Sequence, residues 1–365
     1  NLSVNYRILE SVKISESENQ HVVNYGDVLF TGSSETAEEV GMSSSVTTYF
    51  AEPVYLNSFS FGVRFNEDVQ LIPEFSKYLF RSDLMRAEIS KTASGVTRFN
   101  VSKARFKKLQ IPIPPLEVQK EIVRILDTFT ELTAELTAEL TAELTARKKQ
   151  YEFYRDNLLN FNKLNGGGHN WLTMNELGTF QRGKRFVKDD MISEGVPCIH
   201  YGEMYTYYGT WAKESKSFLS EELVERKNLR IAENGDVVIV AAGETIEDIG
   251  MGTAWLGNEG VVIHDACFSY RSPLNPKYVA YFTRTKQFHD QIKKHISSGK
   301  ISAINARGLE KVLIPVPSPE EQERIVTILD KFDILTTSIS EGLPKEIELR
   351  KKQYEYYRDL LLTFN

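Results

Sequence analysis

The stretch Arg147-Lys-Lys-Gln-Tyr-Glu-Phe-Tyr-Arg-Asp-Asn-Leu-Leu-Asn-Phe161 returns almost unchanged as Arg350-Lys-Lys-Gln-Tyr-Glu-Tyr-Tyr-Arg-Asp-Leu-Leu-Leu-Thr-Phe364. A self-match of this length is far beyond chance and indicates an internal repeat. The match extends backwards through shorter pairs of segments. These pairs are 111–115 with 314–318, Gly26-Asp-Val28 with Gly235-Asp-Val237, Glu35-Thr36 with Glu244-Thr245, and Gly41-Met42 with Gly250-Met251. The sequence therefore predicts one structural unit written twice.

The two copies differ most in their globular parts. Their helical ends match almost residue for residue, whereas the heads share only a skeleton of Gly, Asp and Glu. A duplicated helical framework that carries two diverged globular parts, the heads, suggests two recognition domains held at a fixed separation. The first copy lacks counterparts of roughly 171–209, and the chain opens on Asn1 rather than Met. We therefore expect its start to be trimmed, incomplete or rearranged.

The composition is that of an ordinary globular protein of two or three domains, with 365 residues. No apolar run reaches the length of a membrane span, and Cys198 and Cys267 are too few for a disulfide framework. We expect a cytoplasmic protein without membrane contact. The formal net charge is −6, but Lys and Arg gather in 77–108 and again in 284–311. Each head is thus expected to have a basic side.

Each head reads as mixed α/β. A Gly-Asp turn precedes a buried strand in both, at Gly26 and Gly235. Helical periodicity follows at 74–91 in the first head and at about 276–295 in the second. A Gly-centred loop at 92–100 comes after the first of these helices, and 109–115 is expected to be a short edge strand because of its prolines.

A long helix is predicted from Glu117 to about Phe161, followed by a glycine-rich junction at 162–169. Within the helix, Thr133-Ala-Glu-Leu136 is repeated at 137–140 and 141–144, which is typical of a spacer. The closing helical region begins near Pro319. Glu341-Gly-Leu-Pro344 should break it, because Gly and Pro disfavour helix.

Motifs for catalysis are weak. Asn275-Pro-Lys-Tyr278 lacks the second proline of an adenine-methyltransferase loop, and Ser298-Gly-Lys-Ile-Ser302 lacks the leading glycine of a phosphate loop. His264 and Cys267 have no second ligand pair at metal-binding spacing. We predict no catalytic residue, no metal site and no cofactor site in this chain.

Binding features are stronger. Arg, Lys, Asn and Gln beside glycine turns can reach phosphates and read base edges. Because a basic helix and a glycine loop recur in both heads, we favour DNA binding over merely solvated loops. The tyrosines at 201, 205, 207 and 208 are expected to be mainly core. The candidate DNA-binding residues are Ser33, Ser34, Glu35, Thr36, Ser94, Arg98, Asn100, Arg105, Arg182, Lys184, Arg185, Glu244, Thr245, Lys293, Lys294, Ser298 and Lys300.

Four tyrosines on the repeated helices form a second candidate site. They stand at i, i+3 spacing on each helix, so that both rings of a pair lie on one face. We expect them to pack the two helices together and to serve partner docking. They are Tyr151, Tyr154, Tyr354 and Tyr357.

Taken together, the Ile-Pro-x-Pro segments, Gln119 to Asp127, the Thr-Ala-Glu-Leu tetrads and the Arg-Lys-Lys-Gln-Tyr repeat resemble the specificity subunit of type I restriction–modification systems. The tetrads are most similar to the IC-type members. The resemblance is strong over both helical regions and covers the two heads in outline only.

The resemblance implies an α+β fold in which two α/β target-recognition domains are separated by two long antiparallel helices, a coiled-coil spacer. The implied domains are 1–115 and 166–318, with spacer helices 116–165 and 319–365. The implied partners are double-stranded DNA with a bipartite site, two modification subunits and two restriction subunits. S-adenosylmethionine, ATP and Mg are then expected on those partners.

Two other interpretations stay open. A coiled-coil scaffold that binds only proteins would have no salt-dependent affinity for duplex DNA. A self-contained methyltransferase or nuclease would need the cofactor loop that we do not find.

Overall fold

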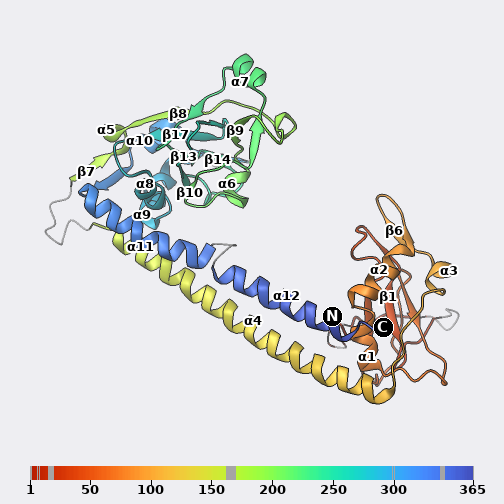
Figure 1. The fold of residues 1–365 in the computed structure, drawn as a ribbon. Coiled ribbons are helices and arrows are strands. Elements are labelled where there is room, and N and C mark those ends of the chain that lie inside the picture. Colours follow the sequence, from red (N-terminus) through yellow and green to blue (C-terminus); the bar gives the residue numbers. More distant parts are fainter. Residues whose placement is uncertain are drawn as a thin grey trace. The chain divides into compact units, whose positions relative to one another are not determined.

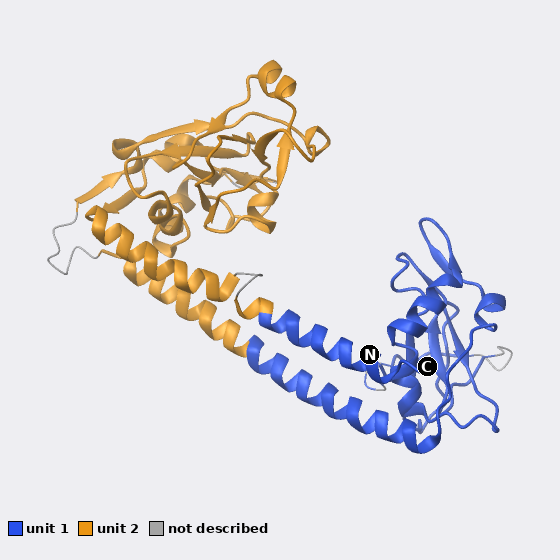
Figure 2. Ribbon diagram, viewed as in Figure 1, with its two compact units in different colours: residues 1–141, 346–365 blue, residues 142–345 orange. Residues whose placement is uncertain are grey.

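The computed structural model describes residues 2–5, 7, 9–14, 20–161, 170–297, 299, 301–337 and 342–364. The chain divides into two compact units, residues 1–141 with 346–365 and residues 142–345 (Figure 2). We call them unit 1 and unit 2. The long helix α4 (Leu116–Leu158) runs through both, so the helices belong to the units rather than to parts of their own.

Unit 1 is built on a three-stranded antiparallel sheet in the order β3-β1-β4. Gly26, at φ +90°, makes the left-handed turn before the central strand. Phe30 on that strand packs with Phe75 and Leu126 in one core. The strands are β1 (Val28–Thr31), β3 (Ser43–Ser45) and β4 (Ser60–Val63), with a small sheet of β2 (Ser33–Ser34), β6 (Phe99–Val101) and β5 (Ala93–Ser94). The helices are α1 (Pro73–Leu79), α2 (Asp83–Lys91) and α3 (Lys103–Phe106).

Unit 2 repeats this plan with additions (Figure 1). Its described residues form a five-stranded sheet in the order β10-β15-β13-β17-β8, a four-stranded sheet in the order β11-β9-β16-β12, and the pairs β14-β18 and β19-β7. The strands of the first sheet are β10 (Trp211–Ala212), β15 (Gly252–Trp255), β13 (Val237–Val240), β17 (Cys267–Arg271) and β8 (Thr179–Arg182). Those of the second are β11 (Ser217–Leu219), β9 (Val196–Ile199), β16 (Val261–Ile263) and β12 (Ile231–Ala232). The paired strands are β14 (Ala242–Gly243), β18 (Ser302–Ala303), β19 (Leu313–Val316) and β7 (Asn170–Thr173).

The helices of unit 2 are mostly short. They are α5 (Met174–Leu177), α6 (Glu203–Thr206), α7 (Glu221–Lys227), α8 (Pro276–Phe282), α9 (Lys286–Ile292), α10 (Ala306–Glu310) and the 3-10 helices η3 (Lys188–Asp190) and η4 (Lys293–His295). The long helices that complete the chain are α11 (Pro319–Thr337) and α12 (Leu343–Leu361).

The internal repeat is visible at the level of single hydrogen bonds. Gln119 of α4 accepts from the N–H of Ile72 at 3.0 Å and donates to the carbonyl of Pro114 at 2.8 Å. Gln322 of α11 does the same with the N–H of Asn275 and the carbonyl of Pro317, at 2.8 and 2.9 Å. Each glutamine is buried, so it ties the start of a head helix to the start of a long helix.

Two helices predicted as continuous are each broken. The segment 74–91 is α1 and α2, because the chain turns at Phe80–Ser82 and the Ser82 hydroxyl caps α2 by accepting from the Met85 N–H. The segment 276–295 is α8, α9 and η4, with Thr285 as the equivalent cap. Apolar periodicity continues across both breaks, so it could not reveal them.

The predicted strand at 109–115 was wrong. In unit 2 the matching segment forms β19, which pairs with β7 in four register positions. Unit 1 has no counterpart of β7 among its described residues, and 109–115 is irregular. The described part of unit 1 also has no counterpart of β8, so β4 is an edge strand there, whereas its counterpart β17 pairs with β8. A strand needs a partner to supply its ladder hydrogen bonds.

The long helices run antiparallel within each unit. In unit 1, Phe129 of α4 lies 5.7 Å from Tyr357 of α12 between ring centroids, and the Thr130 and Tyr354 hydroxyls are hydrogen-bonded at 3.0 Å. In unit 2, Tyr154 of α4 stacks on Phe332 of α11 at 5.4 Å. The predicted break before α12 is confirmed, and its residues 338–341 lie outside the described part. The predicted fold class, two α/β regions related by a repeat with two long antiparallel helices, is confirmed.

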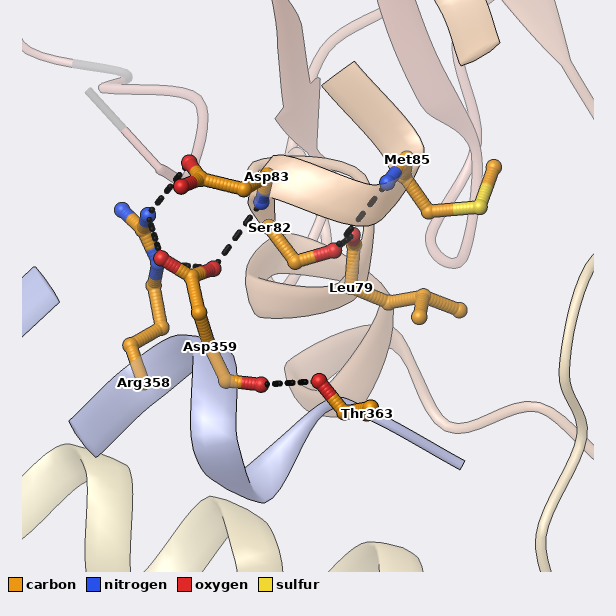
Figure 3. Close-up of polar contacts among 7 residues, drawn as sticks. All are labelled: Leu79, Ser82, Asp83, Met85, Arg358, Asp359 and Thr363. Carbon is orange, nitrogen blue, oxygen red and sulfur yellow. Dashed lines mark hydrogen bonds and ion pairs between the residues drawn. The ribbon is translucent and has the colours of Figure 1, made fainter. Parts of the chain in front are cut away.

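A polar cluster joins α12 to the head in unit 1 (Figure 3). The Asp83 N–H, at the start of α2, donates to the Asp359 carboxylate at 2.9 Å. Arg358 pairs with Asp359 at 2.7 Å and with Asp83 at 3.4 Å. The carboxylate of Asp359 is thus a second cap of α2, supplied from another helix.

Candidate nucleic-acid interface

In both units the candidate loops are anchored by the same pair of backbone hydrogen bonds, which we call the scaffold. It lies at the end of the central strand, β1 in unit 1 and β13 in unit 2. In unit 1 the Gly32 N–H donates to the Phe59 carbonyl at 2.7 Å, and the Val101 N–H donates to the Gly32 carbonyl at 3.0 Å. In unit 2, Ala241, Ala266 and Ile304 repeat these two bonds at 2.7 and 2.8 Å. Three segments distant in sequence therefore meet at one place in each unit.

In unit 1 the structure brings the sequence-predicted residues together. Ser33 and Ser34 of β2 lie beside Asn100 and Phe99 of β6, and Ser94 of β5 lies opposite Asn100 on its other side. Two arginines reach into this small sheet. Arg98 donates to the Ser33 hydroxyl at 2.7 Å, and Arg105 donates to the Ser94 hydroxyl at 3.3 Å. Glu35 and Thr36 follow β2 directly and are exposed.

Sequence reasoning missed two exposed apolar residues of this surface. The guanidinium of Arg98, on the β5–β6 hairpin, stands over the ring of Phe59 at 5.1 Å, and Phe59 directly precedes β4. Val96, at the tip of the β5–β6 hairpin, is 92% exposed. An apolar residue on a polar loop gives no pattern of its own, but its place between Gly95 and Arg98 was a usable signal.

In unit 2 the basic turn after β8 packs against the β16–β17 connection. Arg182 donates to the Asp265 carbonyl at 2.9 Å, and Lys184 donates to the Lys227 carbonyl at 3.4 Å. A Cβ on Gly183 would lie 2.2 Å from the His264 carbonyl oxygen, so only glycine permits this approach. Arg185 is exposed. This connection also carries Ala266, so the basic turn adjoins the scaffold.

The remaining unit 2 candidates come from the segment after β14 and from η4. Glu244 and Thr245 follow β14, whose Gly243 pairs with Ser302 of β18. Lys293 and Lys294 are exposed on η4. Ser298 and Lys300 lie outside the described residues.

A cluster of rings supports the basic turn from within. His264 lies 4.7 Å from His200 and 5.2 Å from Phe186 between ring centroids. Burial lowers the pKa of both histidines, which keeps the rings neutral. His264 Nδ1 lies 3.0 Å from the Asp265 carboxylate and accepts from the Ala266 N–H. Burial raises the pKa of the Cys267 thiol to about 12, so it is not a reactive thiolate.

Tyrosines of the second head are mainly core, as predicted. Tyr208 is buried, and Tyr201 and Tyr205 are half-buried against the same cluster. Tyr207 is exposed. Elsewhere, no group of three or more His, Cys, Asp or Glu that could hold a metal ion occurs among the described residues. The same part of the chain contains no helix with the length and apolarity needed to cross a membrane.

The four helix tyrosines differ in exposure. Tyr151 is buried in the core of unit 2, and Tyr354 is half-buried beside Thr130. Tyr154 and Tyr357 are each 40% exposed, although each also contacts the facing helix. Their geometry suits packing between helices, whereas their role in partner docking stays a prediction.

The chain is similar to known proteins along most of its length. The model of the type I restriction modification DNA specificity domain matches residues 5–146 and 170–349. A putative type I restriction enzyme specificity subunit of Haemophilus influenzae is 37% identical over 289 residues, which are 74% of this chain and 68% of that protein. The EcoR124I/EcoR124II specificity subunit of Escherichia coli is 38% identical over 276 residues, 72% of this chain and 65% of that protein.

Solved structures agree in fold. A chain from a study of assembly and conformational transition of the type I R-M system covers 95% of this chain and 84% of its own length, with a TM-score of 0.71 at 18% identity. The HsdS subunit of Thermoanaerobacter tengcongensis covers 93% of this chain and 80% of its own, with a TM-score of 0.56 at 19% identity. The chain belongs to the family of type I restriction modification DNA specificity domains. The matched region spans about two thirds of the length of the Haemophilus influenzae and Escherichia coli relatives named above.

Proposed function

We propose that this chain is the specificity subunit of a type I restriction–modification enzyme. Each unit reads one half of a bipartite site in double-stranded DNA, and the repeated helices set the distance between the two readings. The protein determines the DNA sequence at which the reaction takes place, and it contributes no catalytic group.

The observation that carries this proposal is the common scaffold with different side chains on it. The hydrogen bonds of Gly32 and Val101 recur at Ala241 and Ile304, so each unit presents its loops at the equivalent position of its own fold. Unit 1 offers two arginines and an asparagine beside this scaffold, and unit 2 offers a basic turn beside it, with further exposed lysines on η4. Because the backbone scaffold is the same in both units and the polar side chains on it differ, the two units are suited to recognising different DNA sequences.

The repeat also suits two identical protein partners. Each copy of the Arg-Lys-Lys-Gln-Tyr segment exposes an aromatic pair, Phe153 with Tyr154 and Tyr356 with Tyr357. Exposed aromatic residues are typical anchors of protein interfaces. One modification subunit would dock on each pair, and two restriction subunits would join them. In this proposal S-adenosylmethionine, ATP and Mg are bound by those partners, and the complex works in the cytoplasm.

Binding to duplex DNA at several salt concentrations tests the DNA half of the proposal. Fluorescence anisotropy with a labelled duplex should give an affinity that falls at least about tenfold between low and physiological salt, because bound phosphates release counterions. Arg98→Ala should weaken binding. Lys120→Ala is the matched control, since this exposed lysine pairs with Glu117 on α4. Affinity that is absent or independent of salt would instead favour the protein-only scaffold.

A further inference from the structure

One exposed loop is nearly the same in both heads although the heads have otherwise diverged. In unit 1 it reads Glu35-Thr-Ala-Glu-Glu-Val-Gly-Met42, and in unit 2 it reads Glu244-Thr-Ile-Glu-Asp-Ile-Gly-Met251. The identical positions include the leading Glu-Thr and the closing Gly-Met. Comparing the two copies therefore distinguishes residues that serve a function common to both heads from residues that serve one head only.

The two loops also close in the same way. The Thr31 N–H donates to the Met42 carbonyl and its own carbonyl accepts from Gly41, at 2.9 and 2.8 Å. Val240, Met251 and Gly250 repeat both bonds at 3.0 and 2.9 Å. Both closing glycines have positive φ, 68° and 89°, which explains why each loop keeps a glycine there.

Each loop begins at the same point of the candidate interface. Glu35 directly follows Ser34, which pairs with Phe99 of the β5–β6 hairpin. Glu244 directly follows Gly243, which pairs with Ser302 of β18. Of the two glutamates that the loops share, the first (Glu35 or Glu244) is therefore next to the segment that differs between the heads, whereas the second (Glu38 or Glu247) is not. The differing segment suits bases that differ between half-sites, and the shared glutamate suits a feature that both half-sites contain.

The chemistry of a carboxylate limits which groups of the DNA the shared glutamates can contact. Both glutamates are exposed, and neither has a hydrogen-bond or ion-pair partner among the described residues. The threonine beside each one is instead held within its loop: Thr36 accepts from the Glu39 N–H, and Thr245 donates to Asp248. A carboxylate only accepts hydrogen bonds and is repelled by phosphates. In the major groove, donors are offered by the amino groups of adenine and cytosine.

We propose that Glu35 and Glu244 each accept a hydrogen bond from the exocyclic amino group of a base that the two half-sites have in common. This inference rests on the proposed function. It assigns the shared glutamates to the common part of the recognition sequence and the neighbouring hairpin and basic turn to the part that differs.

The test is N6-methyladenine mapping in cells that carry the full chain and its modification subunit. Glu35→Ala should relax one position of the first half-site, at a base with an amino group, by roughly 5- to 100-fold in relative methylation. Glu244→Ala should do the same in the second half-site only. Glu35→Gln should keep the motif, because the amide oxygen still accepts. Glu38→Ala and Glu247→Ala, elsewhere on the same loops, are controls that should leave the motif unchanged.

Other outcomes contradict the inference in distinct ways. If both Ala and Gln variants lose methylation at both half-sites and fail to assemble with the modification subunit, the carboxylates contact protein. If the wild-type chain gives a motif that Glu35→Ala and Glu244→Ala leave intact, the glutamates do not read bases, and the proposed function survives. If the wild-type chain assembles but gives no motif, the proposed function fails first.

Discussion

Asp359 holds two groups at the junction of α12 and the head of unit 1. Its carboxylate accepts the N–H of Asp83 and pairs with Arg358, whose side chain is only 14% exposed. Asp359→Ala should destabilise the protein by about 1–2 kcal/mol, because α2 loses a cap and Arg358 loses the nearer of its two ion-pair partners. Urea unfolding measures the change.

The matched control for that prediction is Asp83→Ala. Its side chain is 84% exposed, and its backbone N–H would still donate to Asp359. The expected loss is below about 0.5 kcal/mol, as for most exposed ion pairs. Equal losses of stability in both variants would show that the ion pairs of Arg358, rather than the cap of α2, stabilise the junction.

The two neutral histidines make unit 2 sensitive to acid. Burial lowers the pKa of His264 and His200 below the ordinary value of 6.5, with Asp265 and Arg185 facing His264. A lowered pKa means that stability is fully present above pH 6.5 and is lost as pH falls through the folded pKa. The melting temperature should therefore drop between about pH 7.5 and about pH 5.5. In His264→Gln the drop should be smaller; an equal drop would assign the effect to other groups.

At this scale the sequence predicted residues that gather at the small sheet of unit 1, but not the contacts that hold them. The repeat singled out Asp27 and Asp236, yet the arginines that pair with them, Arg64 and Arg271, were not noticed. A signal existed, because Arg64 directly follows β4 and Arg271 is the last residue of the matching strand β17. Contacts such as Arg98 over Phe59 depend on the path of two loops and leave no spacing in the sequence.

Among the elements, β4 and β17 form a natural comparison. They are the same strand of the repeat, but β4 lacks an outer neighbour among the described residues and β17 has β8. Phe268 and Tyr270 of β17 are almost fully buried, whereas Phe61 and Val63 of β4 are only partly buried. Hydrogen exchange at Ser60–Val63 should be at least about tenfold faster than at Cys267–Arg271. Equal protection of the two strands would mean that β4 is covered in solution.

Element types were predictable where one pattern continued for many residues. The long helix α4 and the break before Leu343 followed from helix-forming composition and from Gly and Pro. The lack of a strand at 109–115 was not predictable from its own residues, because its counterpart in unit 2, β19, forms a strand by pairing with β7. Secondary structure that depends on a distant partner is invisible to local periodicity.

For the whole molecule, the tetrads of α4 are expected to set the spacing of the two half-sites. One Thr-Ala-Glu-Leu unit adds about 6 Å of helix, against about 3.4 Å per base pair of DNA. Deleting 137–140 should shorten the unspecified spacer by one or two base pairs and leave both half-sites unchanged. Methylation mapping of the deletion variant checks this. A change in a half-site sequence would contradict the role of the helix as a ruler.

The duplication was predictable because it is written in the chain itself, from Gly26 and Gly235 to the two Arg-Lys-Lys-Gln-Tyr segments. The identity of the bases read by each unit was not, because readout depends on loop geometry and on DNA shape.

The central claim is that this chain alone decides where a partner methylates DNA. Genome-wide N6-methyladenine mapping should be made in cells with this chain, its modification subunit, or both. The account predicts a bipartite motif only when both are present, with two half-sites separated by a fixed number of unspecified base pairs. Assembly of the two subunits without any such motif, or the same motif without this chain, would contradict it.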